Sequence, residues 1–214
     1  CTAAILLDPF EAFAVGGIGA FLGDITETIF CRITAGYWMS RSSVVWGPFS
    51  IVWGLAIAAV TQLLYRYKDR PASWLFVAGT LLGGAYEYLC SVFTEVVFGT
   101  VFWDYSAIPF NLGGRINLLY CFFWGFAAIA WFKILYPPIS HLIESIPRRF
   151  GTVLTWGLCV FMAVNMVVSS AALVRYNERV RGQAAATSLA AYLDEHFDDA
   201  HMAKVYPKAV HVEK

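Results

Sequence analysis

The sequence predicts an all-α, polytopic helical membrane bundle with about five transmembrane helices, and three observations lead to this. Of the 214 residues, 59% are hydrophobic and only 14% are charged, whereas a soluble domain carries about 25% charged residues. The mean hydropathy is +0.61. Apolar runs recur along the chain with polar turns between them, and each is close to the ~20 residues that a helix needs to cross a bilayer. We therefore expect an integral membrane protein.

Five runs are predicted as spans, and turn-forming residues set their boundaries. They cover residues 11–33, 44–65, 73–98, 116–136 and 152–174. Gly47 and Pro48 fall near the start of the second run, where proline is tolerated in a first helical turn. Pro137 and Pro138 are predicted to end the fourth run, because proline interrupts a helix interior. Residues 139–146 are then expected to form a short interfacial helix.

The composition changes after the fifth run and divides the chain. Residues 1–174 are predicted to form a transmembrane helical domain, and residues 175–214 a short polar C-terminal tail on the membrane surface. Within the tail, helices are predicted at 175–181 and 184–196. The sequence starts at Cys1, which fits a lipidated N-terminus or, as we favour, a trimmed chain. We expect no cleavable signal peptide, because the first apolar run carries acids and lacks a basic segment before it.

Several function classes are disfavoured by what the sequence contains. A net charge of zero argues against nucleic-acid binding. The four histidines lie outside the predicted spans, which argues against a membrane haem held by two histidines. The sequence has no Walker A loop, no G-x-S-x-G elbow and no HExxH. No catalytic residue or metal site is therefore indicated, the cofactor is left unknown, and we favour a protein that is not an enzyme. Active transport would need energy from another polypeptide or an ion gradient.

Four carboxylates interrupt the predicted spans, and they are the first candidates for function. Asp24 and Glu27 lie in the first span, and Glu87 and Glu95 in the third. A carboxylate in the bilayer core costs at least ~2.5–3.5 kcal/mol unless it is paired or reached by water. Asp24 and Glu27 are three residues apart and share a helix face. Glu87, Ser91 and Glu95 are spaced by four and form a polar stripe.

The predicted topology brings these acids toward one membrane side. The first and third spans run in the same direction, so the loops that follow them, residues 32–43 and 99–115, lie on the same side. These loops carry Arg32, Arg41, Asp104 and Arg115. The excess of acids over arginines predicts a polar vestibule that would suit a cation, an amine or a proton. The alternative is that bonds from the glutamates to arginine, tyrosine and serine hold the helices together.

The segment between the third and fourth spans combines aromatic, acidic, amide and guanidinium side chains. These candidates are Trp103, Asp104, Tyr105, Asn111 and Arg115. Pro109 and Gly113 argue against a continuous helix, and non-helical backbone at membrane depth must be buried in protein or line water. We predict a re-entrant element or a lid over the vestibule. Alternatively, the two aromatic residues are interfacial anchors and Asp104 caps a turn.

A wider pattern links these residues to a known family. It comprises Glu27, Arg41, Gly47-Pro48, Gly54, Glu87-Tyr88, Glu95, Trp103-Asp-Tyr-Ser106, Asn111 and Gly114-Arg-Ile116. With it, residues 23–54 and 79–125 resemble a family of small bacterial multi-pass membrane proteins, the CmpB-like, type IV group of ABC-transporter permeases. The resemblance implies a permease-like membrane component in a bacterial cytoplasmic membrane and names no substrate.

Three hypotheses follow. In the first, the chain is a membrane transport component for a small, cationic or protonatable substrate. The membrane acids would line a cavity open to one side, Arg41 and Arg115 would balance them, and Trp103 to Tyr105 would cover the opening. The second is an intramembrane enzyme or cofactor-binding subunit that uses the same acids. The third is a non-catalytic scaffold in a larger membrane complex. Besides the lipid bilayer, we expect a homo-oligomer, or a partner membrane chain or ATPase.

Overall fold

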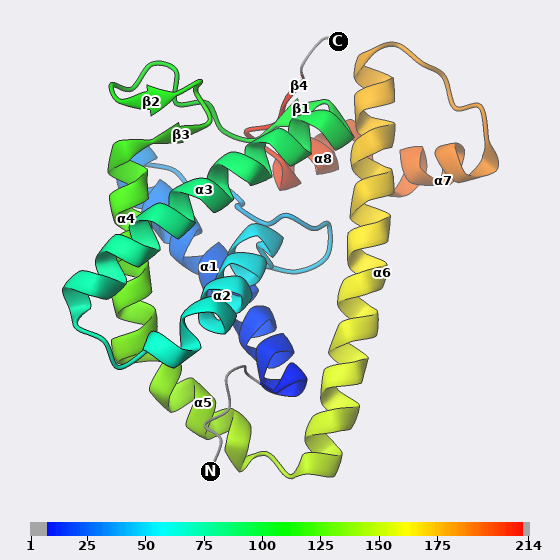
Figure 1. Cartoon of the computed structure of the whole chain (residues 1–214). Helices are drawn as coiled ribbons and strands as arrows, with labels where there is room; N and C mark the ends of the chain where they lie inside the picture. The colour runs from blue at the N-terminus through cyan, green and yellow to red at the C-terminus, as the bar shows by residue number, and fades with distance from the viewer. Residues whose placement is uncertain (1–7, 212–214) are drawn as a thin grey trace.

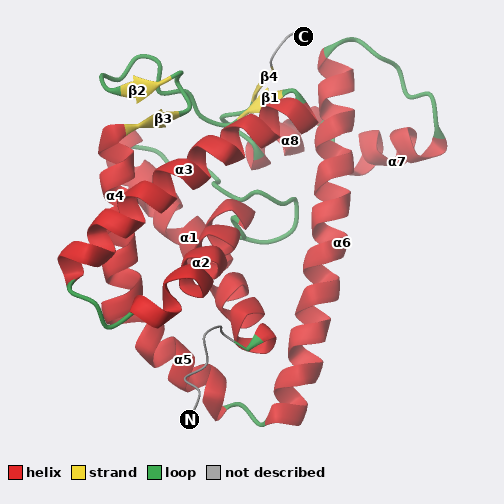
Figure 2. Ribbon diagram, in the orientation of Figure 1, coloured by secondary structure: helices red, strands yellow, loops and turns green. Residues whose placement is uncertain are grey.

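The structure is a computed structural model that describes residues 8–211, and it confirms the all-α membrane bundle (Figure 1). Four of the described helices are long and apolar enough to cross a membrane. They are α1 (Pro9–Ala35), α3 (Ala72–Phe98), the continuous helix Leu118–Ser145, and α6 (Arg148–Val180). Figure 2 shows that strands are confined to short pairs outside the helices. Cys1 lies outside the described residues.

The second predicted span is wrong at its start. Helix α2 covers only Ile51–Leu64, 14 residues, and is extended by a 3₁₀ turn, η1 (Tyr65–Tyr67). Residues 44–50 are not helical, because Gly47 takes a left-handed backbone conformation with φ of 83° and Pro48 has no N–H to donate. The apolar helix therefore begins after this pair rather than around it. It falls short of the ~20 residues of a full span.

The segment before α2 is non-helical backbone that lies against the middle of α6. The backbone N–H of Val45 donates to Ser169 Oγ at 2.9 Å. Asn165 Nδ2 donates to the carbonyl of Trp46 at 2.7 Å. Both polar side chains lie in the interior of the apolar helix α6 and are almost fully buried. They satisfy backbone groups that lipid could not, as irregular backbone at membrane depth requires.

The two prolines do not end the fourth helix, so that prediction is also wrong. Helix α4 (Leu118–Ala130) continues through a π-helical turn, η2 (Trp131–Leu135), into α5 (Tyr136–Ser145). A proline inside an α-helix leaves the carbonyl four residues earlier unpaired and crowds it. The wider π-helical turn accommodates both effects at Pro137 and Pro138. The separate interfacial helix predicted at residues 139–146 is therefore the end of α5.

The C-terminal region starts as a continuation of the last span. The helix predicted at residues 175–181 is the end of α6, which runs unbroken to Val180. Helix α7 (Ser188–His196) begins four residues later than predicted, where the Thr187 hydroxyl accepts a hydrogen bond from the N–H of Ala190. Helix α8 (Asp199–Val205) follows. The division of the chain at residue 174 stays a prediction.

Two short antiparallel strand pairs complete the fold. Strands β2 (Asn111–Leu112) and β3 (Ile116–Asn117) form a hairpin between α3 and α4. Strand β1 (Thr100–Val101), directly after α3, pairs with β4 (Val210–His211). The second pair ties the end of the described chain to the end of α3, and Figure 1 shows β4 and α8 beside that end of the bundle. The C-terminal region is thereby held against the helices.

Arginine and aspartate side chains hold α7 and α8 against α6. Arg175 Nε and Nη2 donate to the two carboxylate oxygens of Asp194, each at 2.8 Å. Arg179 bridges Asp194 and Asp199, with both hydrogen bonds at 2.6 Å. Bidentate arginine–carboxylate pairs are among the strongest hydrogen-bonded ion pairs. Hydrogen bonds from Arg175 and Arg179 lower the pKa of Asp194 from its ordinary 3.8 to about 2.

The substitution Asp194→Asn is expected to speed amide hydrogen exchange in α7, because it removes the charge that both arginines share. The pKa of Asp194 is lowered in the folded protein, so its stabilisation is complete above pH 3.8 and is lost as the pH falls through about 2. Hydrogen exchange measured from neutral to acid pH checks this. Asp199→Asn, at a carboxylate whose side chain is 67% exposed, is the control and should change α7 less. Equal exchange in the two variants would contradict the expectation.

Candidate functional site

A cavity of about 680 Å³ lies between α1, α2, α3, α4 and α6. Its wall is mainly apolar and includes the aromatic side chains of Phe30, Trp53, Phe93, Phe98, Tyr120 and Phe123. Small-molecule sites in proteins typically enclose about 300–1,000 Å³ and are lined in this way. The cavity is therefore large enough for a small organic molecule.

Five of the eleven residues singled out from the sequence line this cavity. They are Glu27, Arg41, Glu87, Trp103 and Tyr105. The other six lie outside its lining: Asp24, Ser91, Glu95, Asp104, Asn111 and Arg115. The structure thus separates the sequence candidates into a group at the cavity and a group behind or beside it.

Glu27 and Arg41 form an ion pair at the cavity wall. Arg41 Nη2 donates to Glu27 Oε1 at 2.9 Å, and the side chains are 18% and 29% exposed for Arg41 and Glu27 respectively. Burial by itself would lower the pKa of Arg41, but the neighbouring Glu27 carboxylate outweighs it and raises the pKa. The non-helical backbone before α2 is what carries Arg41 back to the side of α1.

Glu87 lies deeper in the cavity wall, with only 6% of its surface exposed. Its carboxylate accepts a hydrogen bond from Tyr105 Oη at 2.7 Å and another from Trp124 Nε1 at 2.8 Å. Burial, together with the adjacent Glu87 carboxylate, raises the pKa of Tyr105, which keeps that hydroxyl a donor. Glu87 is therefore held by neutral donors and by no cation among the described residues.

Glu95 and Ser91, which are not among the residues that line the cavity, are tied to Arg115. Arg115 forms an ion pair with Glu95 and donates from Nη1 to Ser91 Oγ at 3.2 Å. Trp103 Nε1 donates to the carbonyl of Arg115 at 2.9 Å. These contacts fasten the β2–β3 hairpin to α3 and place the indole of Trp103 at the cavity.

Asp104 and Asn111 shape the loop itself. Asp104 accepts hydrogen bonds from the N–H and the hydroxyl of Ser106, at 2.8 and 2.6 Å, and these bonds lower its pKa. Asn111 donates to the carbonyl of Ile108 at 2.7 Å and accepts from the N–H of Gly114 at 3.0 Å. Gly114 has φ of 70° and faces Asp104 and Ser106 so closely that a Cβ there would clash. The backbone of this turn therefore depends on both polar side chains.

Sequence reasoning missed several cavity residues. Trp124 was read only as part of an apolar span, and its indole N–H reaches Glu87 because α3 and α4 pack closely. Residues 205–208 were expected on the membrane surface, yet they line the cavity. Tyr206 anchors them by donating to the carbonyl of Ser43 at 3.0 Å. Lys208 adds a cation to the lining. No local pattern predicts these contacts, which join elements far apart in sequence.

Asp24 is buried without the partners that the other membrane acids have. It is 5% exposed, and its Oδ1 has no hydrogen-bond partner in the described part of the chain. Arg41 Nε is likewise buried and without a partner there. The two groups belong to one small polar region, because the charges of Glu27 and Arg41 both act on Asp24.

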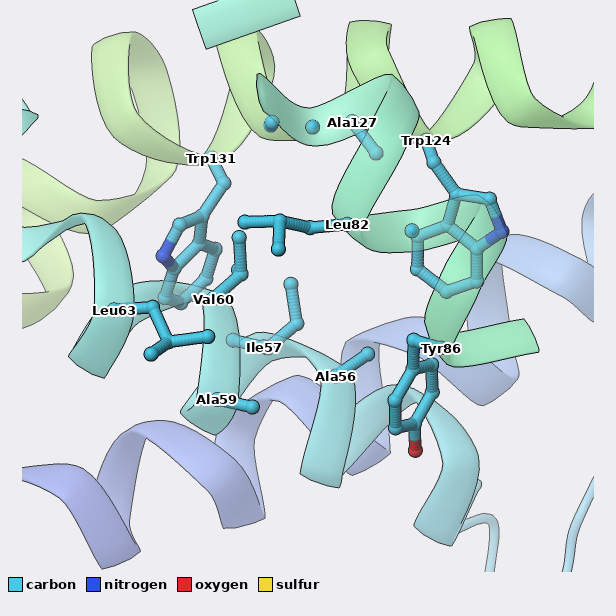
Figure 3. Close-up of a pocket in the computed structure, with 13 residues that line it drawn as sticks. Ala56, Ile57, Ala59, Val60, Leu63, Leu82, Tyr86, Trp124, Ala127 and Trp131 are labelled. Carbon is cyan, nitrogen blue, oxygen red and sulfur yellow. The ribbon is translucent and has the colours of Figure 1, made fainter. Parts of the chain in front are cut away.

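A second, smaller cavity of about 110 Å³ lies between α2, α3 and α4. None of the described residues that line it is charged. Figure 3 shows Trp131 near one end and Trp124 with Tyr86 near the other. Trp124 and Tyr86 line both cavities. The Trp124 ring lies 4.8 Å from that of Trp53, and Tyr86 Oη donates to the carbonyl of Val52 at 2.7 Å. The side chains of Trp124 and Tyr86, with Ala127, therefore lie between the two cavities.

Comparison with known protein families gives a match over most of the chain. A family model described as "Putative ABC-transporter type IV" matches residues 16–170, a range that contains all eleven candidate residues. No curated protein and no solved structure matches the chain. Within residues 8–211, no group of three or more histidine, cysteine, aspartate or glutamate side chains is placed to hold a metal ion.

Proposed function

The chain belongs to the family described as "Putative ABC-transporter type IV", and from this we propose that the cavity of about 680 Å³ is the substrate site of a membrane transport component. The chain is an integral membrane protein, with four helices of spanning length among the described residues. The proposal rests on one observation: the Glu87 carboxylate is buried at the cavity and accepts hydrogen bonds from neutral donors only.

The cavity favours an amphiphile with an apolar body and a cationic or protonatable head. An apolar body would bury its surface against the aromatic wall, which contributes about 25 cal/mol for each Å² removed from water. A cation would find its counter-ion at Glu87, because Glu27 is already paired with Arg41. Desolvated charge pairs of this kind give a site its selectivity. We expect neutral molecules of the same size to bind less tightly.

The two cavities support a path through the bundle. They share Tyr86, Trp124 and Ala127 as a common wall, so movement of the two aromatic side chains would join them. We propose that the substrate passes from the larger cavity to the smaller one across this wall. We further propose that the chain works in a bacterial cytoplasmic membrane, as a homo-oligomer or with a partner ATPase chain that supplies the energy.

Filling the larger cavity is expected to block binding. Ser170 lies on α6 and lines the cavity, so Ser170→Trp should lower the affinity for tetraphenylphosphonium, a lipophilic cation, by at least about tenfold, or ~1.4 kcal/mol. Val167 lies on the same helix and is 69% exposed, so Val167→Trp is the matched control and should bind as the unmodified protein does. Scintillation proximity binding to purified protein in lipid nanodiscs measures both. Equal affinity in the two variants would place the site elsewhere.

A scaffold is the second candidate, and the Glu95–Arg115 ion pair favours it. That pair lies outside the cavity lining and joins α3 to the β2–β3 hairpin, as a helix clamp would. A scaffold predicts that Glu95→Gln loosens the hairpin while no lipophilic cation binds the cavity. If the unmodified protein binds tetraphenylphosphonium and Ser170→Trp loses that binding, the result favours transport over a scaffold.

A further inference from the structure

We propose that Asp24 is a proton-binding site, which carries a proton while Arg41 is paired with Glu27 and gives it up when Arg41 turns to Asp24. The proton site stands on the contacts described below. Its coupling to a substrate rests on the proposed transport function.

The first argument is the surroundings of Asp24. Its side chain lies within α1 at 5% exposure, and Oδ1 has no hydrogen-bond partner among the described residues. An ionised carboxylate in such a place would be an unpaired buried charge, which costs several kcal/mol. A proton on the carboxyl group removes that charge. The arrangement therefore favours the neutral acid while Arg41 is bound elsewhere.

The second argument is that two carboxylates compete for one guanidinium. Asp24 and Glu27 share a face of α1 because they are three residues apart. Arg41 gives its Nη2 to Glu27, while its Nε is buried without a partner among the described residues. One arginine neutralises one carboxylate, and two like charges this close oppose each other's ionisation. The two acids and their one arginine are therefore neutral as a group only when one carboxyl group carries a proton.

The elements packed around Asp24 carry few charged side chains besides Glu27 and Arg41. Helix α2, which packs against α1 beside Gly23, contains no charged residue between Ile51 and Leu64. Cys31 is the other titratable group of α1 that Glu27 and Arg41 influence. Glu87 of α3 also feels the charge of Glu27, and Lys208 lines the cavity that Glu27 and Arg41 share. Arg41 is thus the cation of the segment before α2 that can replace the proton.

The placement of the three groups suggests how the proton could couple to a substrate. Glu27 and Arg41 line the large cavity, whereas Asp24 lies outside its lining. A cation that first reaches Glu87 and then moves to Glu27, which lines the same cavity, would displace Arg41. Arg41 would then neutralise Asp24, whose proton would leave. One positive charge enters and one proton departs, so the net charge of the buried group stays the same.

Infrared spectroscopy of the protein in lipid bilayers tests the site directly, since protonated and ionised carboxyl groups absorb separately. We expect Asp24→Asn to reduce the intensity of the carboxylic-acid C=O band at neutral pH by the amount that one protonated carboxyl group contributes. We expect Glu27→Gln to reduce the band by the same amount, because Arg41 is then free to pair with Asp24 and stabilise its ionised form. Glu95→Gln, at an acid paired with Arg115, is the matched control and should leave the band unchanged. Circular dichroism checks that each variant is folded.

Two results would overturn the proton site: an unchanged acid band in Asp24→Asn, or an acid band in Glu27→Gln equal to that of the unmodified protein. The second result would mean that Asp24 is simply a neutral buried acid without exchange. Added tetraphenylphosphonium tests the coupling and should diminish the acid band of the unmodified protein. If the cation binds and the band does not change, the coupling is wrong. If the cation does not bind while the variants behave as expected, the proposed transport site fails and the proton site stands.

Discussion

Glu87→Ala is expected to lower the free energy of unfolding by about 3–5 kcal/mol, because it leaves two buried donors without their acceptor. Tyr105 Oη and Trp124 Nε1 both donate to this carboxylate, at 2.7 and 2.8 Å. Hydrogen bonds to charged groups contribute about 1.5–3 kcal/mol each. The two donors come from the loop between β1 and β2 and from α4, so their loss would loosen both elements from α3. Reversible unfolding in mixed micelles measures the change.

Two further variants separate the stability effect from the proposed binding role of Glu87. Glu87→Gln keeps one acceptor oxygen and the side-chain shape, so it should destabilise less than Glu87→Ala while still weakening tetraphenylphosphonium binding. Glu144 is exposed on α5, and Glu144→Ala is expected to change stability by no more than about 0.5 kcal/mol. If Glu87→Gln bound the lipophilic cation as tightly as the unmodified protein, the carboxylate charge would have no part in binding.

Gly83→Ala is expected to destabilise the bundle by about 3 kcal/mol, the upper part of the usual range for overpacking. A Cβ at this position would lie 2.3 Å from the Cβ of Trp124 on α4. Neither atom is the end of a flexible side chain, so α3 and α4 would have to separate. Small residues at such crossings let membrane helices approach closely. Displacing Trp124 would also weaken its hydrogen bond to Glu87 and its ring contact with Trp53.

Gly157→Ala is the matched control for this experiment. Gly157 lies within α6, and in the described part of the chain no heavy atom outside its own helix lies within 4 Å of a Cβ added there. Alanine is a better helix former than glycine by about 0.8–1.0 kcal/mol, so this variant should be slightly more stable than the unmodified protein. Thermal unfolding of the two variants in the same detergent compares them. Similar losses of stability would show that close packing at Gly83 is not what matters.

The sequence alone was sufficient for the fold class, the family and most span positions. These depend on local properties, since the length and polarity of an apolar run decide whether a helix can cross a bilayer. The family resemblance is confirmed by the match over residues 16–170. The same reasoning was wrong at Pro48 and at Pro137. Glycine conformation and a π-helical turn, rather than the mere presence of proline, decided where α2 begins and whether α4 ends.

The candidate site shows the same division. The cost of burying charge is enough to draw attention to Asp24, Glu27 and Glu87 from the sequence. Which acid Arg41 binds, which indole reaches Glu87, and whether the C-terminal segment lines the cavity were decided only by the tertiary structure. These contacts depend on how each helix is rotated and how closely it approaches its neighbour. Spacing along one helix defines its faces, but packing between helices determines what each face meets.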